Sequence, residues 1–150
     1  MSKFAASLAV AAVLLSASAI AETAKPTVVL VHGAFADSSS WNGVTRILQK
    51  DGYNVVAAAN PLRSVSGDAA YVSSVVNNIK GPVVLVGHSY GGQVITNAAR
   101  DTNNVKSLVY VAAFAPDAGE AAADLAGKFP GGTLGQALAA PVKLADGSVD

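Results

Sequence analysis

Short apolar runs alternate with segments in which apolar residues recur at helical spacing, and this alternation begins at Thr27. β-Branched residues fill Thr27–Val31, which is typical of a strand buried on both faces of a parallel sheet. Similar runs predict further strands at Tyr53–Ala57, Val83–Val86 and Val105–Ala113. Helical spacing predicts helices from Ser40 to Lys50, from an N-cap at Asp68 to Lys80, and from Gly91 to Arg100. We therefore expect an α/β fold with a mostly parallel sheet and helices on both of its faces.

The N-terminal segment has the pattern of a secretory signal peptide. Lys3 precedes the apolar run Phe4–Leu15, and Ala19 and Ala21 supply the A-x-A pattern of a signal-peptidase site. An uncleaved membrane anchor is the alternative, but a run this rich in Ala and Ser is weakly hydrophobic for a permanent span. We expect residues 1–21 to be removed after Ala21. The mature protein is then secreted or periplasmic and has no stable membrane association.

The pattern changes after Phe114. Residues 115–120 read as a turn, and the remainder up to Asp150 is rich in Ala, Gly and Pro without a clear strand. A helix is expected over Glu120–Lys128, followed by a loop at residues 129–132. Two interpretations remain for residues 115–150: the start of a lid over an active site, or ordinary surface.

Composition and charge remove several classes of function. Hydrophobic residues make up 51% of the chain and charged residues 13%, with a formal net charge of zero. No basic cluster is available to bind nucleic acid or an anionic membrane. The chain has no cysteine, so disulfides, thiolate metal sites and a cysteine nucleophile are excluded. Residues 22–150 are expected to form part of one domain.

The motif G-x-S-x-G occurs at Gly87–Gly91, between a predicted strand and a predicted helix, and this is the context that the motif requires. A sharp strand-to-helix turn leaves no room for side chains at its glycines and exposes the hydroxyl of Ser89. The following helix directs free N–H groups toward a developing oxyanion. We therefore predict Ser89 as the nucleophile and the backbone N–H of Tyr90 as one oxyanion donor. Chance occurrence in a Gly-rich loop is the alternative.

A second candidate element is His32–Phe35, which ends the first predicted strand and can lie beside the Ser89 turn. Because Gly33 allows the backbone to approach closely, the N–H of Ala34 is predicted as the second oxyanion donor, with Phe35 as the alternative. A plain β–α turn without catalytic function is the other interpretation.

Three stretches together resemble the α/β-hydrolase superfamily: Leu30–Ala34 with Trp41, Val84–Gly92, and Val109–Asp117. The resemblance covers residues 27 to about 120. It is closest to the compact branch that holds plant methyl esterases, hydroxynitrile lyases and related bacterial hydrolases. It implies Ser89 as the nucleophile, Ala34 and Tyr90 as oxyanion donors, and no cofactor or metal. The implied partner is a small-molecule ester.

Single positions also distinguish between the activities found in the superfamily. Dehalogenases and epoxide hydrolases attack with an aspartate where this chain has Ser89, so those activities are not expected. Hydroxynitrile lyases carry a threonine where Gly33 stands, which favours an esterase. The expected function is therefore a secreted serine hydrolase that forms an acyl-enzyme on Ser89. A hydroxynitrile-lyase-type carbon–carbon lyase and a catalytically incomplete hydrolase-like fragment remain as alternatives.

The catalytic base is missing from these 150 residues. The superfamily order is Ser, then Asp or Glu, then His, and no histidine follows Ser89. His88 is held in the turn beside the nucleophile, and His32 is interpreted as a structural residue that braces the oxyanion loop. Asp117 is a candidate triad acid, with a turn residue as the alternative. We expect the triad histidine and the final strands of the sheet to lie beyond Asp150.

Overall fold

The computed structural model describes residues 25–128 and 130–149, so the predicted signal peptide at residues 1–21 lies outside the described part. Four parallel strands form one sheet in the order β2-β1-β3-β4. They are β1 (Thr27–Val31), β2 (Val55–Ala58), β3 (Val83–His88) and β4 (Val105–Val111). The predicted parallel sheet is confirmed.

The register of the sheet brings the ends of its strands together at one edge. Val31, the last residue of β1, pairs with Gly87 of β3, and His88 pairs with Val111 of β4. All five residues of β1 are buried, as expected for a strand with neighbours on both sides. The segments that follow β1, β3 and β4 therefore leave the sheet side by side.

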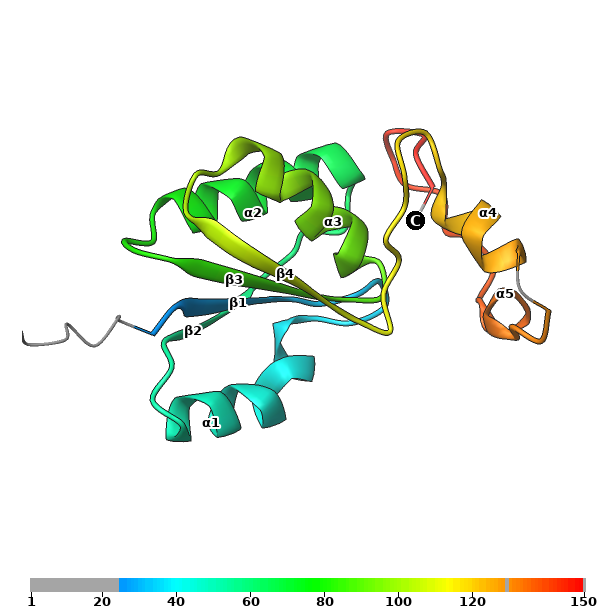
Figure 1. Cartoon of the computed structure of the whole chain (residues 1–150). Helices are drawn as coiled ribbons and strands as arrows, with labels where there is room; N and C mark the ends of the chain where they lie inside the picture. The colour runs from blue at the N-terminus through cyan, green and yellow to red at the C-terminus, as the bar shows by residue number, and fades with distance from the viewer. Residues whose placement is uncertain (1–24, 129, 150) are drawn as a thin grey trace, which may run out of the picture.

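Helices cover both faces of the sheet, as predicted (Figure 1). A short 3-10 helix, Ser38–Trp41, leads into α1 (Asn42–Lys50) on one face, while α2 (Val65–Asn77) and α3 (Gly91–Ala98) lie on the other. A 3-10 turn, Ala99–Asp101, extends α3. The larger apolar core lies between the sheet and the α2–α3 layer, and a smaller one gathers around Trp41 under α1. The two cores hold the layers together through burial of apolar surface.

The prediction that Asp68 caps α2 is wrong. The helix begins at Val65, and its N-cap is Ser64, whose hydroxyl accepts a hydrogen bond from the N–H of Gly67 at 3.1 Å. Serine satisfies an end N–H as well as aspartate does. Asp68 instead lies in the first turn of the helix and is fully buried. Its carboxylate is therefore engaged elsewhere in the fold.

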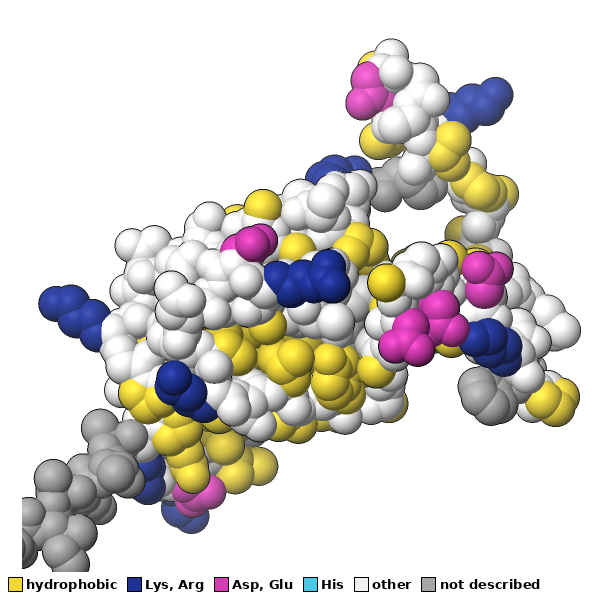
Figure 2. All heavy atoms as spheres, turned by 45° about the horizontal axis from the view of Figure 1, so that its top comes forward, with side chains coloured by type: hydrophobic (Ala, Val, Ile, Leu, Met, Phe, Trp, Pro, Cys, Tyr) yellow, Lys and Arg dark blue, Asp and Glu magenta, His cyan; other side chains and the backbone are white. Residues whose placement is uncertain are grey.

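The fourth strand ends earlier than predicted. β4 stops at Val111, because Ala112 adopts a φ of 42°, in the left-handed region where a strand cannot continue. Within the described sheet β4 is an edge strand, and Val109, Tyr110 and Val111 are each about two-fifths exposed. Figure 2 shows a band of hydrophobic side chains on the surface of the part of the molecule formed by the sheet and its helices.

The chain after β4 lies beyond the carboxyl-terminal edge of the sheet (Figure 1). It contains α4 (Ala122–Gly127), within the helix predicted over residues 120–128, and the short α5 (Leu134–Ala137), which was not predicted. Most of its described residues are exposed. Its interpretation as the start of a lid stays a prediction. No helix in the described ranges is long and apolar enough to cross a membrane.

Gly91 at the start of α3 offers a test of this packing. A Cβ at this position would lie 2.5 Å from the carbonyl oxygen of Val31 and 2.9 Å from that of His32. Since neither backbone oxygen can move freely, Gly91→Val in the full-length protein should lower the free energy of unfolding by at least about 1–3 kcal/mol. Urea-induced unfolding measures this change.

Gly43 provides the matched control, because it lies in the first turn of α1 and a Cβ there would meet nothing within 4 Å. Gly43→Ala should leave the stability unchanged or raise it by up to about 1 kcal/mol. Equal unfolding midpoints for Gly91→Val and the parent would contradict the close contact between α3 and the end of β1.

Candidate active site

Ser89 occupies the sharp turn between β3 and α3. The strand ends at His88 and the helix begins at Gly91, so two residues reverse the chain. Ser89 has a φ of 53°, a left-handed conformation that is uncommon for a residue with a side chain. Strain of this kind persists only where the surrounding structure holds it, and it concentrates at functional sites.

Backbone hydrogen bonds hold this strained residue from two directions. The carbonyl oxygen of Ser89 accepts from the N–H of Gly92 at 3.0 Å and from the N–H of Phe114 at 3.1 Å. Its own N–H donates to the carbonyl of Val111 at 3.4 Å. The turn is therefore tied both to the first turn of α3 and to the chain that leaves β4.

The loop after β1 packs directly against the serine. A Cβ built at Gly33 would lie 2.8 Å from the Cβ of Ser89 and 3.1 Å from the carbonyl oxygen of His88. At Gly87 a Cβ would lie 2.5 Å from the carbonyl oxygen of Gly91. The predicted absence of room at Gly87 and Gly91 is confirmed, and glycine at position 33 lets the two loops touch.

The two predicted oxyanion donors lie on one cavity. It has a volume of about 330 Å³, and Ala34 and Tyr90 line it together with residues 62–65. In the part of the chain that the structure describes, neither of their backbone N–H groups donates a hydrogen bond. Phe35, the alternative donor, does not line this cavity, and its side chain is 79% exposed. Neither N–H group is thus committed to an acceptor among the described residues, as an oxyanion donor requires.

Neither histidine contacts the serine hydroxyl through a hydrogen bond. His32 is buried, and its Nδ1 lies 2.9 Å from the carbonyl oxygen of Gly33, so this nitrogen carries the proton and donates. The exposed His88 ring meets Trp41 edge-on, with centroids 6.4 Å apart. The hydroxyl of Ser89 has no hydrogen-bond partner among the described residues. Among the described residues, no base is therefore hydrogen-bonded to the hydroxyl of Ser89.

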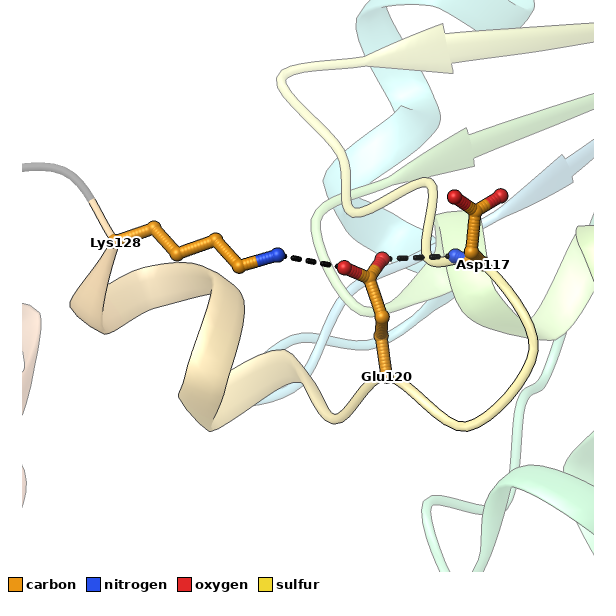
Figure 3. Close-up of polar contacts among 3 residues, drawn as sticks. All are labelled: Asp117, Glu120 and Lys128. Atoms are coloured by element: carbon orange, nitrogen blue, oxygen red, sulfur yellow. Dashed lines mark hydrogen bonds and ion pairs between the residues drawn. The ribbon is translucent and has the colours of Figure 1, made fainter.

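Asp117 lies in the exposed loop after β4 (Figure 3). Its N–H donates to the Glu120 carboxylate at 2.9 Å, and Glu120 pairs with Lys128 at 2.6 Å. The hydrogen bond from Lys128, and then the one from the N–H of Asp117, lower the pKa of the Glu120 carboxyl group. The carboxylate of Asp117 points away from Glu120 and has no hydrogen bond to Ser89 or to a histidine in the described ranges. Its role as the triad acid stays a prediction.

One polar contact beside the nucleophile was missed at the level of sequence. The hydroxyl of Tyr90 donates to Oδ2 of Asp68 at 2.8 Å, and Oδ1 of Asp68 accepts the backbone N–H of Arg63 at 3.1 Å. Burial, and then the hydrogen bond to Asp68, raise the pKa of Tyr90, so the phenol remains a neutral donor. Asp68 lies in α2 and Tyr90 in the turn before α3, and no local pattern links them. The described residues hold no group of three or more acidic or histidine side chains that suits a metal ion.

Comparisons with known proteins agree with this geometry. The model of a family described as the alpha/beta hydrolase family matches residues 28–148. A carbendazim hydrolyzing esterase from Nocardioides sp. (strain SG-4G) is 33% identical over 105 residues, which are 61% of this chain and 43% of that protein.

Solved structures show the same fold. An extracellular alpha/beta-hydrolase from a Paenibacillus species matches with a TM-score of 0.63 and 25% identity, over 75% of this chain and 49% of that one. A polyneuridine aldehyde esterase variant matches with a TM-score of 0.59 and 21% identity, over 70% and 48%. The chain thus spans somewhat less than half the length of these relatives.

The contact between Gly33 and Ser89 predicts a loss of activity without loss of fold. Gly33→Ala in the full-length protein places a methyl group against the Cβ of Ser89, so the loop or the serine must shift. Since a displacement of about 1 Å can lower turnover 10²-fold, we expect kcat/KM for a short-chain ester to fall roughly 10- to 100-fold.

Steady-state kinetics measure this effect, with circular dichroism as the check on folding. Gly119→Ala is not a suitable control because of its positive φ, whereas Gly127→Ala meets nothing within 4 Å and should keep the parental rate. A Gly33→Ala enzyme with the parental kcat/KM would show that the loop after β1 does not constrain the serine.

Proposed function

The chain belongs to the alpha/beta hydrolase family, and we propose that it carries the nucleophile of a secreted serine hydrolase that cleaves a small carboxylic ester. One observation carries the proposal: Ser89 is strained at the turn between β3 and α3, beside a cavity lined by Ala34 and Tyr90, whose N–H groups are unengaged. A nucleophile next to two oxyanion donors is the arrangement that acyl transfer requires.

The proposed reaction has two halves. Oγ of Ser89 attacks the ester carbonyl carbon while its proton passes to a base, and the N–H groups of Ala34 and Tyr90 stabilise the charge on the carbonyl oxygen. The carbon–oxygen bond to the alcohol breaks, the alcohol takes the proton, and an acyl-enzyme remains. Water then gives a proton to the base and attacks the acyl carbon, the bond from this carbon to Oγ of Ser89 breaks, and Oγ takes the proton back as the acid leaves. We propose that the base is a histidine outside these 150 residues, and Asp117 remains a candidate for the acid.

The close contact at Gly33 favours hydrolysis over the lyase alternative. Hydroxynitrile lyases of the superfamily carry a threonine at this position, and a Cβ here would lie within 3 Å of the Cβ of Ser89. A threonine would therefore require a different arrangement of the two loops. Ester hydrolysis is also the activity for which the 33% identical relative is named.

The cavity lined by Ala34 and Tyr90 has a volume of about 330 Å³, which is within the range for small-molecule pockets. Export is supported by the sequence pattern at residues 1–21 and by the extracellular description of the Paenibacillus relative.

Replacement of the nucleophile tests the function. Ser89→Ala in the full-length protein should retain the fold and lower kcat for a chromogenic short-chain ester by about 10⁴-fold or more, because no acyl-enzyme can form. Ser107→Ala, a change at an exposed serine of β4, is the matched control and should keep the parental rate. Activity of Ser89→Ala within tenfold of the parent, or cyanide release from a cyanohydrin without ester hydrolysis, would contradict the proposal.

Export is tested separately. The segment that ends in Ala19-x-Ala21 should be removed, so N-terminal sequencing of exported protein is expected to begin at Glu22. Substitution of Ala21 by a bulky residue should block this cleavage. Intact Met1 in the membrane fraction of cells that express the parent would point to an anchored protein instead.

A further inference from the structure

We propose that Asp68 is a positioning residue for the hydrolysis, because its buried carboxylate joins the nucleophile turn to the loop at residues 62–65, which lines the same cavity as Tyr90. This inference rests on the proposed function. Asp68 does not line the cavity, so it acts through two residues that do, Tyr90 and Arg63.

The geometry gives each carboxylate oxygen one partner. Oδ2 accepts the hydroxyl of Tyr90 at 2.8 Å, and Tyr90 immediately follows the nucleophile and supplies a proposed oxyanion donor. Oδ1 accepts the N–H of Arg63 at 3.1 Å, in the loop that leads into α2. That loop contains Leu62, with a φ of 59°, and lines the cavity together with Ala34 and Tyr90. One side chain thus binds two segments that line the cavity.

The surroundings make this carboxylate a rigid support. Asp68 has no exposed surface, and its backbone N–H donates to the carbonyl of Ser64 at 2.8 Å in the first turn of α2. Two donors, the hydroxyl of Tyr90 and the N–H of Arg63, converge on this carboxylate in the first turn of α2. Charge-assisted hydrogen bonds are shorter and stronger than neutral ones, so the ring of Tyr90 is fixed more firmly than by packing alone.

Other contacts hold α2 against α3, so the hydrogen bond between Asp68 and Tyr90 is not required for that packing. Apolar residues of both helices meet in the larger core, among them Val72, Val76, Val94 and Ile95. A separate buried hydrogen bond, from Oγ of Ser73 to the carbonyl of Ala98 at 3.0 Å, also joins the two helices. What Asp68 adds is a link to the residue after the nucleophile and to the wall of the cavity.

The test compares Asp68→Asn and Tyr90→Phe with Ser73→Ala in the full-length protein. An asparagine accepts only through its oxygen, so either Tyr90 or Arg63 loses its acceptor. Tyr90→Phe removes the same link from the other side. For both variants we expect kcat per active site, counted by titration with an organophosphonate, to fall about 10- to 100-fold, with a smaller change in KM. The double variant should be no slower than the slower single variant, because both changes remove one link.

Ser73→Ala is the matched control, since it deletes a buried hydrogen bond between the same helices without touching the turn. It should lower the urea midpoint and keep the parental kcat per titrated site. The positioning role is overturned if Asp68→Asn and Tyr90→Phe keep the parental kcat per titrated site, or if their effects add fully. Should Asp68→Asn fail to fold, Tyr90→Phe alone decides, because it keeps the ring and loses only the hydroxyl.

Titration of the parent separates the two proposals. A parent that is not labelled at Ser89 overturns the proposed function, and with it the positioning role. A parent that is labelled stoichiometrically, combined with unchanged turnover per site in the Asp68→Asn and Tyr90→Phe variants, overturns only the role of Asp68.

Discussion

The reversal of the chain within two residues between β3 and α3 is the constraint on which the rest of the site depends. Such a turn forces Ser89 to a φ of 53° and brings the start of α3 against the end of β1. Only glycine fits at Gly91 and Gly33, since a Cβ at either position would lie within 3 Å of its neighbours. The parallel pairing of β1 with β3 makes the contact geometrically unavoidable, because Val31 and Gly87 lie in register. The strain at the serine is thus sustained by the sheet itself.

A second constraint is the burial of a carboxylate next to this turn. An unpaired Asp in a core would be strongly destabilising, and Asp68 is tolerated because both of its oxygens accept hydrogen bonds. Those bonds come from a loop and from Tyr90, so satisfying the carboxylate also fixes the direction of both segments. Polar groups in a core of low dielectric specify geometry more strongly than apolar ones do, because an alternative arrangement leaves them unpaired. The same physics that permits the burial therefore orders the cavity walls.

The parts of the fold that depend on local pattern were predictable, and those that depend on tertiary contact were not. Thr27–Val31 was predicted with its observed bounds, because a short run rich in β-branched residues favours a buried strand over a helix. Asp68 was misassigned as a cap because Asp and Ser have similar preferences at helix starts, and only Tyr90, distant in sequence, distinguishes them. The predicted end of β4 was too late because no residue pattern indicates the left-handed conformation of Ala112. Of the site, the serine and both oxyanion residues were predictable from the motif and its flanks, and their catalytic roles stay predictions.

The nucleophile, the oxyanion donors and the general base have different structural requirements, which depend on where each lies in the fold. The proposed nucleophile and both proposed oxyanion donors belong to turns at the carboxyl ends of β1 and β3, which adjacent pairing holds together within a few residues of each strand. A general base has no such requirement, since it needs only to reach the hydroxyl from the solvent side, and neither His32 nor His88 has a hydrogen bond to it. The electrostatic component of catalysis can therefore be built by the described strands and helices. Oxyanion donors and binding without a functional triad give accelerations on the order of 10³-fold over water, so the remaining rate must come from activation of Ser89 by a separate group.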